Sequence, residues 1–159
     1  MNVVNRALQH LASTRPGTWI FLNVFPHIDR RLLRLTRGRL SVAVGQPVLL
    51  LTTTGARSGQ PRTTPLMFMR EGDDVVLIAS AGGSTRNPAW YYNLRAHPEA
   101  AVTLGGRTLR CKAREAGGAE RDALWNRACE FYVGFSKYQK RAGERRVPVM
   151  ILSPLAGEV

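Results

Sequence analysis

The residues best suited to chemistry lie in a short polar stretch between two apolar runs. It reads Thr-Thr-Thr-Gly-Ala-Arg-Ser-Gly-Gln-Pro-Arg over residues 52–62. Its glycines allow unusual backbone angles, so that amide N–H groups can converge on an anion. Arg57 and Arg62 can each make forked, charge-assisted contacts with phosphate oxygens. The stretch predicts a phosphate-binding loop, although a polar hairpin loop with two solvated arginines explains the same composition. It is not a Walker loop, because the Gly-Lys-Ser/Thr ending is missing.

A second stretch, residues 79–83, contains only alanine, serine and glycine. Side chains this small let a flat ring lie against the backbone, and the Ser80 hydroxyl can bond a ring edge or a substrate oxygen. Asn87 and Pro88 predict the start of a helix, because asparagine is a strong N-cap and proline is favoured at the first helical position. The positive end of that helix can attract an anionic group. Trp90 and Tyr91 on it are interpreted as pocket wall or, more simply, as core aromatics.

Aromatic residues surround a glycine in a third stretch, residues 131–138. Such a cluster can roof a pocket and exclude water, and Tyr132 and Tyr138 carry hydroxyls that can pass a proton. A small core cluster beneath a loop is the plainer interpretation. Cys111, Cys129 and the 3 histidines have no metal or redox spacing, so we expect no metal site.

Short apolar runs separated by turn residues must position these stretches. They predict strands at residues 48–53, 62–70, 75–79, 100–104, 108–113 and 147–152. The first three are expected to form a meander, and the continuous apolar run at 75–79 to be buried on both faces. Helices are predicted from Asn87 to just before Pro98 and over residues 119–131. We therefore expect an α+β domain around a mostly antiparallel sheet or small barrel.

Residues 1–45 differ from the rest of the chain, and we expect an amphipathic helical extension there, ahead of a single domain at 46–159. Apolar residues recur at helical spacing up to Leu11, and a second amphipathic stretch ends in a basic run from Arg30 to Arg39. Helices packed on the core explain this pattern, and peripheral contact with an anionic membrane at the inner face of the plasma membrane is the alternative. Because no apolar run approaches the ~20 residues of a membrane span and no signal-peptide pattern is present, we expect a cytoplasmic protein.

The charge of the chain is unusual. Its net charge is +12, and since only Lys112, Lys137 and Lys140 are lysines, 23 − 3 = 20 of the basic residues are arginines. Arginine is the residue suited to forked contacts with phosphate and carboxylate. The excess predicts a polyanionic partner, which can be nucleic acid, anionic lipid or a phosphorylated cofactor with an acidic tail. We do not expect nucleic acid, because no recognised nucleic-acid motif or stacking platform is present.

Together these stretches resemble the deazaflavin-dependent nitroreductase family of actinobacteria. The matching pieces are residues 51–62, Pro65-Leu66, 79–83, 87–91 and Asn93-Leu94, with matching spacing, and the similarity runs from about Pro47 to Pro154. The resemblance implies a split β-barrel, of the kind that also binds FMN, holding coenzyme F420, which has a deazaflavin ring, a phosphate-bearing linker and a tail of glutamates. By analogy the cofactor-binding residues are Thr54, Gly55, Ala56, Arg57, Ser58, Gln60, Arg62, Pro65, Met67, Ala79, Ser80, Ala81, Gly82, Gly83, Asn87, Trp90, Tyr91, Asn93 and Phe135.

The activity that the resemblance implies is hydride transfer from reduced coenzyme F420 to a quinone, an activated enone or a nitroaromatic compound. Ser80, Tyr132 and Tyr138 are the candidates for orienting the substrate or relaying the proton that follows. The family pattern has a tyrosine where this chain has Met67, a lysine at Ala81 and a hydroxyl-bearing aromatic near Phe135. The alternative is a split barrel that binds FMN, or one that only carries its cofactor, and either a monomer or a homodimer is compatible with the pattern.

Overall fold

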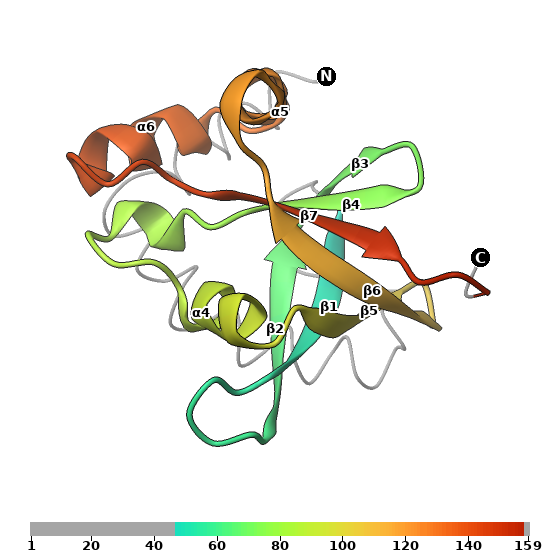
Figure 1. The fold of residues 1–159 in the computed structure, drawn as a ribbon. Coiled ribbons are helices and arrows are strands. Elements are labelled where there is room, and N and C mark those ends of the chain that lie inside the picture. Colours follow the sequence, from blue (N-terminus) through green and yellow to red (C-terminus); the bar gives the residue numbers. More distant parts are fainter. Residues whose placement is uncertain (1–46, 158–159) are drawn as a thin grey trace.

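A computed structural model describes residues 47–157, which form one curled antiparallel sheet with helices packed around it (Figure 1). The sheet order is β2-β1-β5-β6-β7-β4-β3, and each neighbouring pair is antiparallel. The strands are β1 (Val48–Thr54), β2 (Pro61–Met67), β3 (Met69–Glu71), β4 (Asp74–Ile78), β5 (Glu99–Leu104), β6 (Arg107–Glu115) and β7 (Val149–Pro154). The predicted N-terminal extension and its helices lie outside the described residues.

The two edges of the sheet are joined by consecutive segments of the chain. β2 ends at Met67, which pairs with Val48 of β1, and β3 begins at Met69, which pairs with Val76 of β4. Phe68 lies between them with its side chain buried in the core. The single strand predicted at residues 62–70 is therefore wrong in this respect, because burial of Phe68 turns the chain and redirects it to a new partner. The predicted α+β split barrel is confirmed.

The barrel interior is filled by apolar side chains from opposite strands. Leu49 and Leu51 of β1 are fully buried there with Leu77 of β4 and Leu152 of β7. The neighbouring residue on β4, Val76, faces the other way and packs with Leu124 of a covering helix. β4 is thus buried on both faces, as its continuous apolar run predicts.

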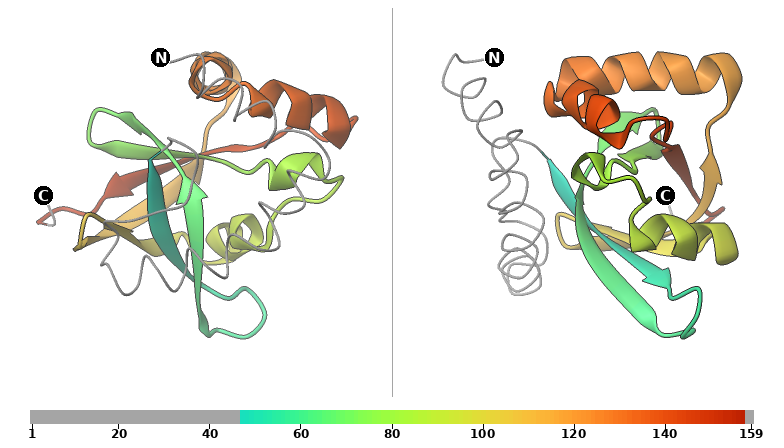
Figure 2. Two further views of the ribbon diagram at one scale, coloured as in Figure 1. Left: turned by 180° about the vertical axis from the view of Figure 1, so that it is seen from behind. Right: turned by 90° about the vertical axis from the view of Figure 1, so that its left-hand side faces the viewer.

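Helices cover two opposite sides of the barrel. α5 (Gly118–Phe131) and α6 (Gly134–Ala142) lie together on one side, and α4 (Ala89–Ala96) lies on the other, next to the β1–β2 loop (Figures 1 and 2). The predicted helices at 119–131 and before Pro98 are confirmed, whereas α6 is a helix that the sequence patterns did not predict. Between these sides lies a short 3₁₀ turn, η1 (Ala81–Gly83).

The predicted asparagine cap of α4 is wrong. The N-cap residue is Pro88, and no side chain caps the helix. Asn87 does not cap because its Oδ1 accepts a hydrogen bond of 2.6 Å from Nη1 of Arg145, 58 residues further along the chain. A tertiary contact has replaced the local one that the sequence favours.

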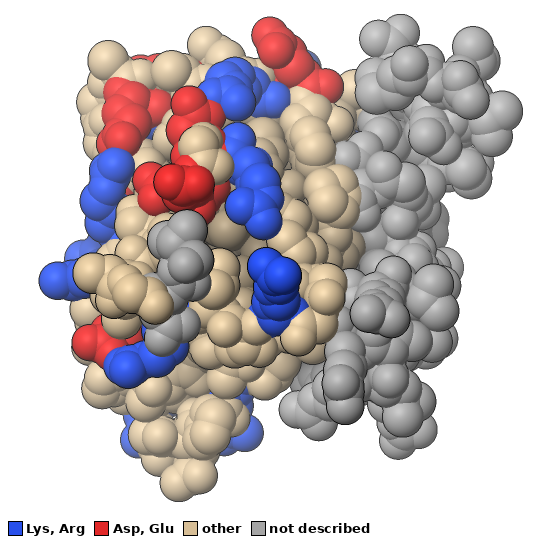
Figure 3. All heavy atoms as spheres, turned by 90° about the vertical axis from the view of Figure 1, so that its right-hand side faces the viewer, with Lys and Arg blue, Asp and Glu red and all other residues tan. Residues whose placement is uncertain are grey.

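Charges of both signs lie next to one another on the face of the molecule drawn in Figure 3. Ion pairs join acidic and basic side chains from different elements, including Arg114 with Glu120 and Arg110 with Glu99. Because each pair places opposite charges side by side, the surface around it has no strong electrostatic potential of a single sign. In the part of the chain that the structure describes, no helix is long and apolar enough to cross a membrane.

Candidate functional site

The predicted phosphate loop is a compact turn that joins β1 to β2. The ladder between the strands continues to Thr54 opposite Pro61, so the loop is held at its base. The Gly55 N–H donates to the carbonyl of Gln60 at 2.9 Å, and the Gly59 N–H donates to the carbonyl of Gly55 at 2.8 Å. A Cβ on Gly55 would lie 2.6 Å from Ser58 Oγ and 3.1 Å from the Gln60 carbonyl. A side chain at position 55 would therefore require Ser58 to rotate and the Gln60 carbonyl to move slightly, so glycine is the residue that fits this closed turn without rearrangement.

A single side chain from α4 fixes this loop to the body of the protein. Asn93 is 8% exposed, and its Oδ1 accepts the Ala56 N–H at 2.9 Å. Its Nδ2 donates to Thr53 Oγ1 at 3.0 Å, and that hydroxyl faces the Arg62 carbonyl at 3.4 Å. Asn93 thus links the end of β1, the loop and the start of β2. Because both ends of its amide are used, the loop position depends on this residue.

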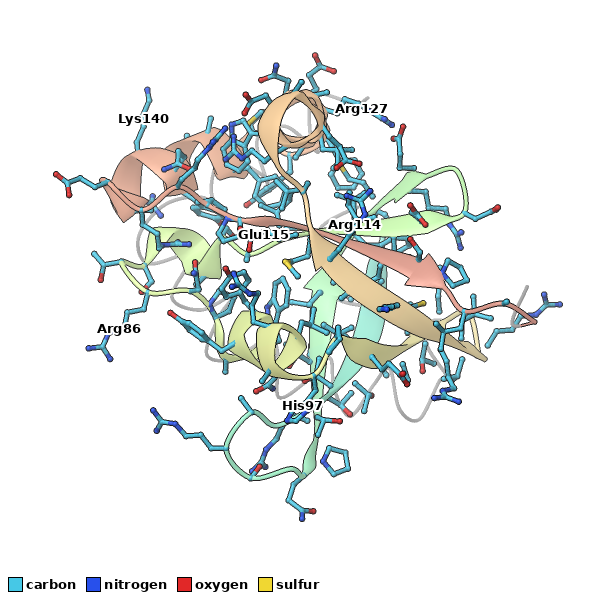
Figure 4. All side chains as sticks on the ribbon, viewed as in Figure 1. Arg86, His97, Arg114, Glu115, Arg127 and Lys140 are labelled. Carbon is cyan, nitrogen blue, oxygen red and sulfur yellow. The ribbon has the colours of Figure 1, made fainter. Side chains whose placement is uncertain are left out.

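A pocket of about 790 Å³ opens between the loop and α4. Three guanidinium groups contribute to it, and its lining contains no acidic residue. Arg86 extends outward from the segment that precedes α4 (Figure 4). The lining residues are Gly55, Ala56, Arg57, Ser58, Arg62, Arg86, Ala89, Tyr92 and Asn93. A concave site with three cations and no anion suits a ligand with several negative charges.

The predicted small-residue stretch forms the turn between β4 and α4. Ser80, Ala81 and Gly82 are partly exposed there, whereas Ala79 and Gly83 are buried. Ala81 has φ +47°, and Gly82 and Gly83 follow with φ +63° and +85°. A Cβ on Gly83 would lie 2.7 Å from the Tyr138 carbonyl, because α6 packs directly on this turn. The exposed part of the stretch is therefore Ser80 to Gly82, with helix α6 against its far side.

The predicted aromatic stretch is a buried cluster under α5 and α6. Tyr132, Phe135 and Tyr138 are each 4% exposed, and the Tyr132 and Tyr138 hydroxyls lie 3.2 Å apart. The Phe135 and Tyr132 rings form a T-shaped pair with a centroid distance of 5.2 Å. Burial, together with the neighbouring phenol of Tyr138, raises the pKa of Tyr132 far above its ordinary value. Tyr132 therefore stays protonated at neutral pH.

The structure brings together only part of the predicted set. Six of the predicted residues line the pocket: Gly55, Ala56, Arg57, Ser58, Arg62 and Asn93. Thr54, Gln60, Pro65 and Met67 lie on the adjoining loop and on β1 and β2. Ala79, Ser80, Ala81, Gly82, Gly83 and Asn87 lie on the turn before α4. Phe135, Tyr132 and Tyr138 lie in the cluster under α5 and α6.

The two aromatics at the start of α4 point into the barrel core. Trp90 and Tyr91 are 6% and 7% exposed and belong to the main core cluster. The Tyr91 hydroxyl donates to Glu115 Oε2 at 2.9 Å and accepts from Arg95 Nη1 at 3.0 Å. Burial, with the hydrogen bond to Glu115, raises the pKa of Tyr91. This placement matches the core interpretation of these two residues.

Sequence reasoning missed three residues of the pocket, Arg86, Ala89 and Tyr92. Tyr92 is the one large hydrophobic side chain exposed among the described residues, at 49%. Residues 89, 92 and 93 follow the spacing i, i+3, i+4, which places them on one face of α4. That spacing from Asn93 was the signal that could have found two of the three.

The fourth missed residue, Arg145, has no such signal. It lies after α6, yet its guanidinium reaches the turn before α4 and donates to the carbonyls of Ala79, Ser80 and Ser84. Burial lowers the pKa of Arg145 from its ordinary value, but an arginine in this range stays charged. Within residues 47–157, no group of three or more His, Cys, Asp or Glu side chains could hold a metal ion.

Comparison with known proteins gives a consistent set of relatives. The family model described as F420H(2)-dependent quinone reductase matches residues 27–154. A Mycobacterium tuberculosis (strain ATCC 25618 / H37Rv) protein named F420H(2)-dependent quinone reductase is 36% identical over 139 residues, covering 80% of this chain and 93% of that protein.

Two solved structures are similar in both sequence and fold. One, described as an F420-H2 dependent reductase (FDR-A), is 40% identical with a TM-score of 0.62 and covers 67% of this chain and 94% of its own. The other, described as a domain-swapped dimer, is 35% identical with a TM-score of 0.64 and covers 87% of this chain and 99% of its own.

Proposed function

The chain belongs to the F420H(2)-dependent quinone reductase family, and we propose that it transfers a hydride from reduced coenzyme F420 to a quinone. The observation that carries this proposal is the pocket beside α4, which is lined by the three exposed arginines Arg57, Arg62 and Arg86. Guanidinium forks bind phosphate and carboxylate oxygens in pairs. A ligand with a phosphate and a tail of carboxylates is complementary to such a site.

The residues of the site fit this cofactor. The pocket volume of about 790 Å³ lies in the range of ordinary cofactor and ligand sites. The Gly55 turn keeps side-chain bulk away from the base of the loop, as a close approach of phosphate to backbone requires. The partly exposed Ser80, Ala81 and Gly82 lie on the segment that leads to Arg86, so a flat ring and a charged tail can be bound by neighbouring parts of the chain.

Each group of residues has a proposed task. Arg57 and Arg62 bind the phosphate, and Arg86 extends the positive surface toward the carboxylate tail. Asn93 holds the loop in its binding position through its bonds to Ala56 and Thr53. When bound, the reduced deazaflavin supplies the hydride, and the protein contributes orientation and proximity.

Reduction of a quinone also requires a proton, and the chain offers two sources of a hydroxyl. Ser80 is partly exposed on the turn before α4, where a substrate can reach it. Tyr132 and Tyr138 are buried and face each other at 3.2 Å. We assign substrate orientation to Ser80 because it is accessible, and we assign a supporting role to the buried pair, in which Tyr132 precedes α6 and Tyr138 lies within it.

A turnover assay tests the proposed function. Oxidation of reduced coenzyme F420 by the purified protein is followed by absorbance with a panel of quinones, activated enones and nitroaromatic compounds. We expect quinones to give the highest kcat/KM and reduced FMN to give no comparable rate as the donor. Absence of catalysed oxidation with every acceptor, or equal rates with reduced FMN, contradicts the proposal.

Three further points belong to the proposal. We place the enzyme in the cytoplasm, with residues 1–45 as an extension of the domain at 46–159. We also propose a homodimer, since a relative at 35% identity is described as a domain-swapped dimer. The net charge of +12 favours contact with anionic lipid. Flotation of the full chain with anionic vesicles, but not with neutral ones, is the expected result, and equal recovery with both contradicts this contact.

A further inference from the structure

One arginine outside the pocket holds the whole turn between β4 and α4. Arg145 Nε donates to the Ser84 carbonyl at 2.8 Å, Nη1 donates to the Ala79 carbonyl at 3.1 Å, and Nη2 donates to the Ser80 carbonyl at 2.8 Å. Nη1 also donates to Asn87 Oδ1 at 2.6 Å. All four acceptors are neutral oxygens, and the ion pairs found within residues 47–157 do not include Arg145. The guanidinium fork is used to fix a loop, not to pair with a carboxylate.

The backbone that carries Arg145 is itself anchored from two helices. Gln139 of α6 donates from Nε2 to the Arg145 carbonyl at 2.8 Å, and its Oε1 accepts the Val147 N–H at 2.9 Å. Arg121 of α5, which is 8% exposed, donates from Nη2 to the Val147 carbonyl at 3.0 Å. The backbone at Arg145 is therefore held in place by side chains of α5 and α6. The position of the Arg145 guanidinium at the turn depends on how these two helices are placed.

The turn needs an external constraint because its backbone is strained. Ala81, at φ +47°, is the only residue other than glycine with positive φ in the described part of the chain. The left-handed region is unfavourable for a residue with a Cβ, and such conformations persist when the surroundings determine them. Arg145 supplies such surroundings through its contacts on both sides of Ala81, at residues 79 and 80 and at residues 84 and 87.

The same contacts hold the segment that carries Arg86, a residue of the pocket lining. Ser84 and Asn87, both bound by Arg145, lie on either side of Arg86, which lines the pocket. Ser80, Ala81 and Gly82 are the partly exposed residues proposed to lie against the ring. We propose that Arg145 is a second positioning residue of the cofactor site, beside Asn93: it sets the shape of residues 79–87 and thereby the affinity and environment of the bound ring. This inference rests on the proposed function, because it concerns the same site.

Hydrogen exchange of the protein without cofactor tests the first half of the inference. Arg145→Lys keeps the positive charge, but an ammonium cannot reach four oxygens in the planar fork. We expect amides of residues 79–87 to exchange at least about tenfold faster than in the parent, because local opening follows the loss of these bonds. The matched control is Arg146→Lys, whose exposed side chain pairs with Asp122 and should leave this segment unchanged. Unchanged exchange in Arg145→Lys overturns the inference.

Fluorescence titration with coenzyme F420 tests the second half. We expect the dissociation constant of Arg145→Lys to rise about tenfold or more, and the emission of the saturated complex to shift toward that of free cofactor, since charge-assisted bonds position the turn. Adding Ala81→Gly to Arg145→Lys should recover part of the affinity, because glycine adopts the positive φ without strain. Parent-like affinity and emission in Arg145→Lys overturn the inference, even if hydrogen exchange has changed.

Two results would be interpreted differently: unfolding of Arg145→Lys, and failure of the parent protein to bind coenzyme F420. If Arg145→Lys unfolds, Asn87→Ala removes only one of the four acceptors, and faster exchange with weaker binding is again expected; parent-like values for both overturn the inference. If the parent protein itself does not bind coenzyme F420, the proposed function fails and the positioning role fails with it. The exchange experiment still reports whether Arg145 fixes the turn.

Discussion

Asn93 is the residue whose replacement should reveal most about the site. Its amide makes two hydrogen bonds from a position that is 8% exposed, to the Ala56 N–H and to Thr53 Oγ1. Each is expected to contribute about 1 kcal/mol net, so Asn93→Ala should lower the free energy of unfolding by about 2 kcal/mol. Urea unfolding followed by tryptophan fluorescence measures this loss. The loop that carries Arg57 should also lose its fixed position, so cofactor affinity should fall in the same variant.

Asn93→Asp distinguishes the effect of loop position on cofactor binding from the effect of charge in the pocket. The carboxylate can still accept the Ala56 N–H, but it cannot donate to Thr53 Oγ1, so part of the stability should be kept. It also places a negative charge in a pocket lined by three arginines, where a polyanionic ligand must bind. We expect fluorescence titration to show about tenfold or greater loss of affinity for coenzyme F420, larger than its loss of stability explains. Parent-like affinity in Asn93→Asp, or unchanged urea midpoints in Asn93→Ala, would refute the reasoning.

Two other residues give independent predictions. Gly55→Ala places a methyl group 2.6 Å from Ser58 Oγ and 3.1 Å from the Gln60 carbonyl, so Ser58 must rotate away and the loop backbone must shift; we expect about tenfold weaker cofactor binding with an unchanged circular dichroism spectrum, and parent-like binding would contradict the need for this loop geometry. Tyr132→Phe removes the 3.2 Å contact with Tyr138 and should cost about 1 kcal/mol in urea unfolding at neutral pH. Burial raises the folded-state pKa of Tyr132, so its contribution is complete below the ordinary value of 10.0 and is lost as the pH rises above it. Melting temperatures of the parent should therefore fall more steeply above pH 10.0 than those of Tyr132→Phe, and parallel curves would count against this pKa.

The strands were predictable because their apolar runs and turn residues agree with the fold. The break at Phe68 was not, since Met67, Phe68 and Met69 continue the apolar run without a turn residue. What divides the strand is a change of partner, from Val48 on one side to Val76 on the other. α6 was missed for a related reason. Gly134 and the aromatic residues give no helical signal, and its buried face is set by packing on α5 and η1.

The residues of the site also fall into two groups: those that neighbouring residues in the sequence identify, and those that only tertiary contacts place there. The loop at 52–62 could be recognised because its glycines, hydroxyls and arginines are contiguous. Arg86 was not recognised, because no local pattern links it to the loop, whereas Ala89 and Tyr92 share a face of α4 with Asn93 and could have been found from that spacing. Arg145 could not be found by any local pattern, since its partners lie 58 to 66 residues away. It also displaced a local prediction, the asparagine cap at residue 87, by binding that side chain itself.

The most direct test of the account is the affinity for coenzyme F420 of a variant that lacks both loop arginines. Arg57→Ala with Arg62→Ala is compared, by fluorescence titration over a range of salt concentrations, with Arg107→Ala and Lys112→Ala, an exposed pair outside the pocket that removes the same charge. Because each charge-assisted bond contributes about 1.5–3 kcal/mol, we expect at least about hundredfold weaker binding and a smaller salt dependence in the loop variant. The control should bind within about twofold of the parent. Equal affinities in the two double variants would contradict the central claim that these guanidinium groups hold the cofactor.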